Sequence, residues 1–185
     1  MVVLKENNLL NSLSQMGVDL GAKNQAVELL SGLEFPTRKT EDWRYTSVKK
    51  ILKKKYVQFN KAEQVVLSNE IVPFLDAYNI VLVNGVYSKE LSDVNFPDGV
   101  VVATFPNAME EYSSLIHSAF NVIAKNKEEV FTALNTSYFH EGLFIHISKK
   151  VKVEKPIHVI HVNTKSNVVS NVRLLIVADS FSEVG

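Results

Sequence analysis

The spacing of hydrophobic side chains changes along the chain, and in the first part of the chain it is typical of helices. Hydrophobic residues recur every three or four positions from Leu9 to Met16, Gly17 follows, and a second such run extends from Ala22 to Leu30. This spacing gives one hydrophobic face to a helix, and a glycine at the end readily adopts the left-handed conformation that closes it. We therefore predict a hairpin of two helices.

The next segment, which ends at Lys55, predicts a helix that begins after Thr40. Acidic residues come first and five lysines come last, which is the order that the helix dipole favours. The hydrophobic residues that would share one face are Tyr45, Val48 and Leu52. A break at which Thr46 caps a second short turn is the alternative, and the pattern does not decide between them.

The middle of the chain indicates a mixture of strands and helices. Short runs of strand-forming residues extend from Ile80 to Val83 and from Val100 to Thr104. Asn84-Gly85 follows the first run, and this dipeptide between hydrophobic residues is a strong signal for a hairpin turn. Helical spacing then returns from Ala108 to His117 and from Lys125 to Leu134.

After Asn135 the helical spacing disappears and alternation takes its place. The alternating hydrophobic residues are Leu143, Ile145, Ile147, Val151, Val153, Val172, Leu174 and Ile176. Alternation of this kind predicts strands with two different faces. The hydrophobic groups recur about every 15 residues, which is compatible with the coils of a stacked β architecture. Because residues 181–185 resemble the start of another strand, we expect an N-terminal portion of a longer protein, or a last coil covered by a partner.

The amino-acid composition argues against several classes of protein. The 185 residues are 46% hydrophobic and 22% charged, and 20 basic against 20 acidic residues give a net charge of zero. A neutral chain lacks the electrostatic signature of a nucleic-acid or membrane-surface binder. Without cysteine, the chain can form neither disulfides nor thiolate metal sites, and we expect it in the reducing cytoplasm. No hydrophobic run approaches the ~18 residues of a membrane span.

Four of the five histidines fall between His140 and His161, which raises the question of a metal site. His158 and His161 are three positions apart, so a flat strand would place them on opposite faces. No acidic residue stands at a matching short spacing. We therefore interpret these histidines as isolated side chains on or beside a sheet, and we predict no metal site.

The sequence contains no recognisable catalytic set. The phosphate-loop, nucleophile-elbow and zinc-helix signatures are all missing, and His140-Glu141-Gly142 is an acid–histidine pair without a second histidine. The lysines that end at Lys55 are interpreted as a solvated helix end. Trp43, the only tryptophan, is interpreted as an anchor of the helix on the core. We predict a non-catalytic binding or scaffold protein.

Four ordered stretches carry a resemblance to a known family. They are Phe35–Thr46, which reads FPTRKTEDWRYT, Leu82–Tyr87 with Leu91–Asp93, Phe131–Thr136 and Gly142–His158. Together they resemble the SufB/SufD family of iron–sulfur cluster assembly proteins, over about Leu33 to Gly185. The start at Thr37 and the run Ile157–Val162 are more similar to the SufD branch than to the SufB branch.

The resemblance implies an α+β protein in which a helical N-terminal region and a small mixed α/β segment, residues 1–135, lead into a right-handed parallel β-helix. Residues 136–185 would be its first coils, truncated at the C-terminal end. It also implies a scaffold that works with SufB-like and SufC-like proteins, SufC being an ATPase. The iron–sulfur cluster would be held transiently by the full complex, outside this segment, so we expect no cofactor, cluster-site or ATPase-binding residue here.

Two questions stay open at the level of sequence. The four residues Arg38, Glu41, Trp43 and Tyr45 form either a docking surface or a packing motif, and the exposed end of the β coils makes self-association plausible. Two other functions are weighed against the scaffold. One is a carbohydrate-active or acyl-transfer enzyme built on a β-solenoid, and the other is a nucleic-acid-binding module that uses the lysine-rich helix.

Overall fold

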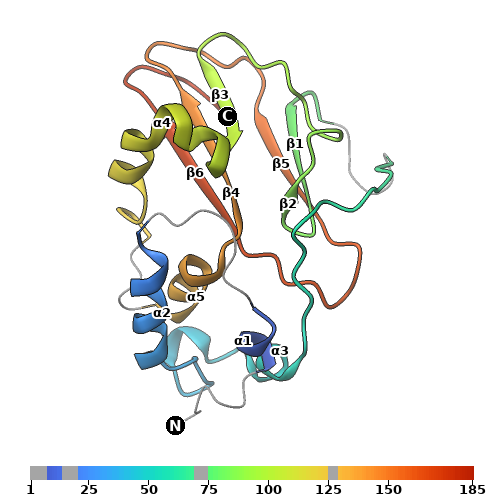
Figure 1. Ribbon diagram of the computed structural model, residues 1–185, viewed down its shortest axis with the longest axis vertical. Helices are drawn as coiled ribbons and strands as arrows, with labels where there is room; N and C mark the ends of the chain where they lie inside the picture. The colour runs from blue at the N-terminus through green and yellow to red at the C-terminus, as the bar shows by residue number, and fades with distance from the viewer. Residues whose placement is uncertain (1–7, 14–20, 69–74, 125–128) are drawn as a thin grey trace.

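The computed structural model describes residues 8–13, 21–68, 75–124 and 129–185. Figure 1 shows most of the helices gathered at one end, and two small sheets with one longer helix beside them at the other. In chain order the elements are α1 (Asn8–Asn11), α2 (Lys23–Gly32), the 3-10 helix η2 (Glu41–Trp43), α3 (Lys49–Lys53), β1 (Tyr78–Val83), β2 (Val86–Tyr87), β3 (Val100–Thr104), α4 (Phe105–Ala119), α5 (Val130–Tyr138), β4 (Glu141–Ile147), β5 (Ile157–Val162) and β6 (Val172–Ala178).

The strands form two three-stranded sheets, with the orders β2-β1-β5 and β3-β4-β6. In the first sheet β1 is parallel to β5, with Ile80 opposite Val159, and antiparallel to β2. In the second sheet β4 is parallel to β6, with Ile145 opposite Ile176, and antiparallel to β3. The chain therefore leaves one sheet after β4, adds β5 to the other sheet, and returns to place β6 beside β4 (Figure 1).

The prediction of a right-handed parallel β-helix is wrong, although the α+β class is confirmed. Each sheet contains an antiparallel pair as well as a parallel one, and no closed or solenoid sheet forms in the described residues. Alternating hydrophobic residues determine which faces of a strand are buried, but they do not determine the direction of the neighbouring strand. The run from Val151 to Val153 makes only an isolated bridge, between Lys152 and Glu183. The division of the chain at residue 135 stays a prediction.

Hydrophobic side chains from both sheets form the core between them. Ile80 and Leu82 of β1 pack in one cluster with Leu143, Ile145 and Ile147 of β4, and all five are almost fully buried. The alternation predicted for β4 therefore places Leu143, Ile145 and Ile147 between the two sheets. The opposite face of β4 is buried too, because α4 covers it.

Two further clusters attach the helices. Phe105 and Ile116 of α4 pack on Phe144 of β4, so this helix covers the outer face of its sheet. At the other end, Leu30 of α2 and Leu134 of α5 share a cluster with residues of α1 and α3. No helix in the described part of the chain is long and apolar enough to cross a membrane.

The helices agree only partly with the sequence analysis. Helix α2 is confirmed, and α4 and α5 lie where helical spacing returned, although residues 125–128 of the second run lie outside the described residues. Glu129 caps α5, because its carboxylate accepts hydrogen bonds from the amides of Phe131 and Thr132, at 3.1 and 2.6 Å. Of the first predicted helix only α1 is described, and Met16 and Gly17 lie outside the described residues.

The single helix predicted after Thr40 is wrong, and two short helices, η2 and α3, replace it. The Thr40 hydroxyl does not cap a helix; it accepts a hydrogen bond from the Thr37 amide at 3.2 Å and so closes a turn. Tyr45 does not share a face with the buried Val48 and Leu52, because 91% of Tyr45 is exposed. The break near Thr46, which the sequence left open, is closer to the structure.

Candidate functional site

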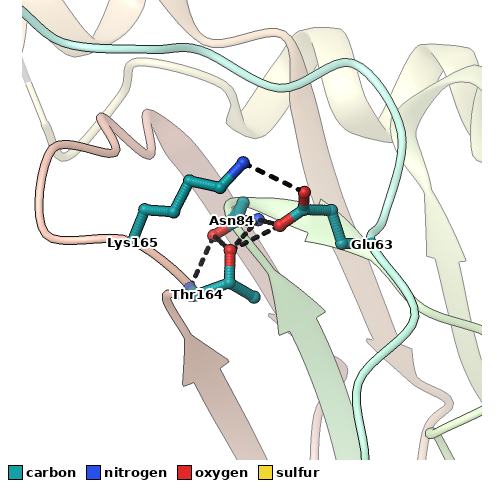
Figure 2. Close-up of polar contacts among 4 residues, drawn as sticks. All are labelled: Glu63, Asn84, Thr164 and Lys165. Atoms are coloured by element: carbon teal, nitrogen blue, oxygen red, sulfur yellow. Dashed lines mark hydrogen bonds and ion pairs between the residues drawn. The ribbon is translucent and has the colours of Figure 1, made fainter.

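The hairpin turn between β1 and β2 is the centre of a polar cluster that we call the Asn84 cluster: Glu63, Asn84, Thr164 and Lys165 (Figure 2). Asn84 and Gly85 have φ angles of +53° and +84°, as a tight hairpin turn requires. Asparagine tolerates this left-handed conformation better than other residues with a side chain. The Asn-Gly prediction is thus confirmed, since Val83 faces Val86 across the turn.

The Asn84 side chain joins segments that are far apart in sequence. Its Nδ2 donates to Glu63 Oε2 and to Thr164 Oγ1, both at 2.9 Å, and its Oδ1 accepts from the Thr164 amide at 2.9 Å. The Thr164 hydroxyl donates to Glu63, and Lys165 Nζ lies 3.3 Å from Glu63 Oε1. One fully buried amide therefore connects the loop before β1, the hairpin and the loop after β5.

The electrostatics of the Asn84 cluster favour an ionised Glu63. The hydrogen bond from Thr164, with smaller contributions from Lys165 and Asn84, lowers the pKa of this carboxyl below its ordinary value. The polar atoms of the Asn84 side chain are all hydrogen-bonded within the cluster. Such an arrangement holds loops in position and presents no free base or nucleophile.

Sequence reasoning missed the Asn84 cluster. The Asn-Gly dipeptide indicated the turn, but it gave no indication of what the asparagine side chain would bind. Glu63 and Thr164 are 101 positions apart, and neither stands in a motif. Their contact depends on the parallel pairing of β1 with β5, which the alternation did not specify.

The four residues of the predicted docking or packing motif are divided by the structure. Trp43 is half-buried and packs on Phe131, with 5.1 Å between the ring centroids, in the helical cluster. Arg38, Glu41 and Tyr45 are exposed. Trp43 therefore anchors the segment on the core, as the sequence indicated, whereas the other three side chains are exposed and are not part of the buried cluster. A docking role for these residues stays a prediction.

The four clustered histidines lie in separate surroundings. His140 is buried and faces Gln58, with 3.4 Å between His140 Nδ1 and Gln58 Nε2. Burial, with a smaller contribution from the charge of Lys23, lowers the pKa of His140. His158 contacts Asn79 on one face of β5, at 3.2 Å. His161 stands opposite Leu82 in the register, on the other face, as its spacing from His158 predicted.

The remaining histidine of this group, His146, is paired with an acid. Its Nε2 lies 3.1 Å from Asp179 Oδ2, and its ring lies 5.6 Å from the ring of Tyr112. This pair has only one carboxylate. Within the described ranges, no three histidine or acidic side chains come close enough together to hold a metal ion.

A second polar cluster holds β6 against the helices. The Arg173 guanidinium donates to Asn135 and Thr136, both at 3.1 Å, and to Asn121, and it lies over the ring of Phe120. Partial burial lowers the pKa of Arg173 from its ordinary value. These acceptors are all neutral, so the cluster fixes the position of the strand by hydrogen bonds and ring stacking.

Comparison with known proteins adds evidence that the side-chain geometry does not contain. The family model described as the SufBD protein N-terminal region matches residues 5–159. An iron–sulfur cluster assembly SufBD family protein of Synechocystis is 24% identical over 98% of this chain and 41% of its own length. The iron–sulfur cluster assembly protein SufD of Bacillus subtilis is 31% identical over 52% of this chain and 22% of its own length.

The chain matches only part of the length of each of these relatives. A further SufBD family protein, from Staphylococcus saprophyticus, is 27% identical over 52% of this chain and 20% of its own length. The chain thus spans less than half the length of these curated relatives. The family model, however, covers most of the 185 residues and includes both the helical end and β1 to β4. The chain belongs to the SufBD family of iron–sulfur cluster assembly proteins.

Proposed function

We propose that this chain is a non-catalytic, SufD-like part of a scaffold on which iron–sulfur clusters are assembled in the cytoplasm. The match of the SufBD N-terminal family model to residues 5–159 is the observation that carries the proposal. The similarity to the Bacillus subtilis protein named SufD favours the SufD branch. The side-chain clusters support a structural role, because the Asn84 and Arg173 clusters connect loops and elements through satisfied hydrogen bonds.

The proposed partners are a SufB-like protein and a SufC-like ATPase, as the resemblance of the four sequence stretches implies. The cluster is cargo of the complete assembly in this proposal, and residues 1–185 contribute no ligand to it. In this proposal residues 1–185 contribute a folded structural unit, made of the two sheets and the helical end, to the scaffold.

Copurification tests the partner assignment. A tagged copy of residues 1–185 and a tagged copy of a full-length SufD-like relative would each be coexpressed with SufB-like and SufC-like proteins. We expect the full-length protein to retain both partners and residues 1–185 to retain neither. If residues 1–185 retain both partners at equal yield, the proposal that the contacts with these partners lie outside residues 1–185 is wrong. If neither protein retains them, the partner assignment itself is wrong.

Reconstitution tests the absence of a cluster ligand. The purified chain would be incubated anaerobically with ferrous iron and sulfide, desalted, and examined by visible absorption. We expect no stable charge-transfer band, since the chain contains no cysteine. A band that survives desalting with stoichiometric iron would contradict the proposal that residues 1–185 hold no cluster.

A further inference from the structure

The segment from Pro36 to Lys55 concentrates positive charge in a chain that is neutral as a whole. It contains eight basic and two acidic residues, a net charge of +6, so the rest of the chain carries −6. All eight basic side chains are exposed. The segment belongs to the end of the molecule formed by α1, α2, α3 and α5 (Figure 1). A local field of this kind attracts anionic ligands.

A pocket of about 550 Å³ lies within this segment. The residues that line it are Pro36, Thr37, Arg38, Lys39, Ser47 and Lys49. Three of them are cationic and two carry hydroxyl groups, whereas Glu41 and Asp42 do not contribute to the lining. Guanidinium, ammonium and hydroxyl groups are the donors that bind carboxylates and other oxyanions in proteins.

Among the described residues, no carboxylate forms an ion pair with the positive charges of the pocket. Ion pairs in the described portion of the chain join His146 to Asp179, Lys152 to Glu183, Lys155 to Asp76, and Lys165 to Glu63. None of these pairs involves a residue between Pro36 and Lys55. The cationic groups around the pocket therefore have no described carboxylate partner.

Hydrogen bonds within a turn and buried neighbouring side chains fix the backbone on both sides of the pocket. Two hydrogen bonds close the turn that forms one wall: the Thr37 amide donates to the Thr40 hydroxyl at 3.2 Å, and the Thr40 amide donates to the Thr37 carbonyl at 2.9 Å. Trp43 follows and packs on Phe131. On the other wall, Val48 is buried between Ser47 and Lys49. A site whose backbone is already fixed loses less entropy when it binds a ligand.

We propose that this pocket, which we call the basic pocket, binds carboxylate side chains from an acidic segment of a partner protein. Hydrophobic contact area is available in the same segment, since Tyr45 is 91% exposed and Ile51 is 47% exposed. Exposed aromatic residues beside arginine are typical of protein interfaces. The inference does not depend on the scaffold role, because it rests on the charges and walls of the pocket alone.

Nucleic acid is the less suitable ligand for the basic pocket. Glu41 and Asp42 are exposed between the two basic stretches and interrupt the continuous basic surface that a phosphate backbone needs, whereas they do not line the pocket in which single carboxylates would bind. Nucleic-acid surfaces also combine several stacking aromatic residues with an overall positive charge. Here the chain is neutral, and Tyr45 is the one strongly exposed aromatic residue of this segment.

A binding titration with a defined probe tests the basic pocket. A hexaglutamate peptide would be added to the purified chain at low ionic strength, with a hexaglutamine peptide as the uncharged control. Trp43, the only tryptophan, reports binding by its fluorescence, and calorimetry gives an independent dissociation constant. We expect hexaglutamate to bind and hexaglutamine not to bind.

Paired variants locate the site. Lys39→Gln with Lys49→Gln removes two positive charges from the pocket, and Lys89→Gln with Lys149→Gln removes two exposed charges elsewhere. We expect the first pair to weaken hexaglutamate binding at least about tenfold, since charge-assisted hydrogen bonds are lost, and the second pair to change it less than about twofold. Both pairs alter exposed side chains only, so both should fold.

Three results would overturn the proposal. The first is no binding of hexaglutamate by the unmodified chain, and the second is an equal loss of affinity in both paired variants. The third is tighter binding of a single-stranded hexanucleotide than of hexaglutamate, which would make the basic pocket a nucleic-acid site. None of these results bears on copurification with SufB-like and SufC-like proteins, so the two proposals fail separately.

Discussion

Removal of the Asn84 side chain is expected to destabilise the sheets more than any exposed substitution does. The side chain is fully buried and makes three hydrogen bonds of 2.9 Å, two to the Thr164 residue and one to the Glu63 carboxylate. A hydrogen bond contributes about 0.5–1.5 kcal/mol net, and more when the partner is charged. Asn84→Gly keeps a backbone that tolerates φ of +53°, so it should lower the free energy of unfolding by about 2–4 kcal/mol.

Asn84→Ala adds a second effect to the same loss. Alanine is disfavoured in the left-handed conformation by about 1 kcal/mol, so this variant should be less stable than Asn84→Gly. The control is Asn95→Ala, an exposed residue for which we expect a change within about 0.5 kcal/mol. The order of stability should therefore be wild type, then Asn84→Gly, then Asn84→Ala.

Urea unfolding followed by far-UV circular dichroism measures these differences. With a slope of about 2 kcal/mol per molar urea, Asn84→Gly should lower the midpoint by roughly 1–2 M. A midpoint equal to that of the wild type would show that the Asn84 cluster contributes nothing. A greater stability of Asn84→Ala than of Asn84→Gly would show that the backbone conformation at this turn has been assigned incorrectly.

Three other properties are open to direct measurement. Gly142→Ala would place a Cβ 2.3 Å from the ring of the buried Phe105, so we expect a loss of about 1–3 kcal/mol in urea unfolding; wild-type stability would contradict this packing. Burial lowers the pKa of His140 below 6.5, so the unfolded chain binds more protons and the melting temperature should fall as pH drops through and below about 6.5. His140→Gln should flatten that part of the curve, and an unchanged slope would contradict the assignment. Ile176 is 53% exposed on β6, which has a free edge among the described strands, so Ile176→Lys should reduce self-association in analytical ultracentrifugation; a monomeric wild type would refute the expectation.

The parts of the fold that depend on neighbouring residues could be predicted from the sequence. The Asn84-Gly85 turn needs only two residues that tolerate a positive φ, and the alternation at Leu143 and Ile145 needs only one buried face. Helix α2 likewise follows from local spacing. These features are determined within a few residues, and the structure agrees with them.

The parts that depend on distant partners were predicted incorrectly or not at all. The periodicity of the last third suggested stacked coils and the family resemblance implied that they are parallel, yet β3 pairs with β4 in the antiparallel direction. The spacing of Tyr45 and Val48 predicted one shared helix face, but η2 ends at Trp43 and α3 begins only at Lys49. The Asn84 cluster joins Glu63 to Thr164 across 101 positions, and no short motif connects these two residues.

The central claim, a scaffold role in iron–sulfur cluster assembly, is tested most directly by the activity of an iron–sulfur enzyme in cells. Aconitase activity would be measured in a strain whose gene for the protein containing this chain has been deleted, and again after the gene is restored. Aconitase protein would be quantified in parallel, so that activity is expressed per enzyme molecule. We predict a loss of activity without a loss of aconitase protein, reversed by the restored gene. Full activity in the deletion strain, with no other assembly system present, would contradict the account.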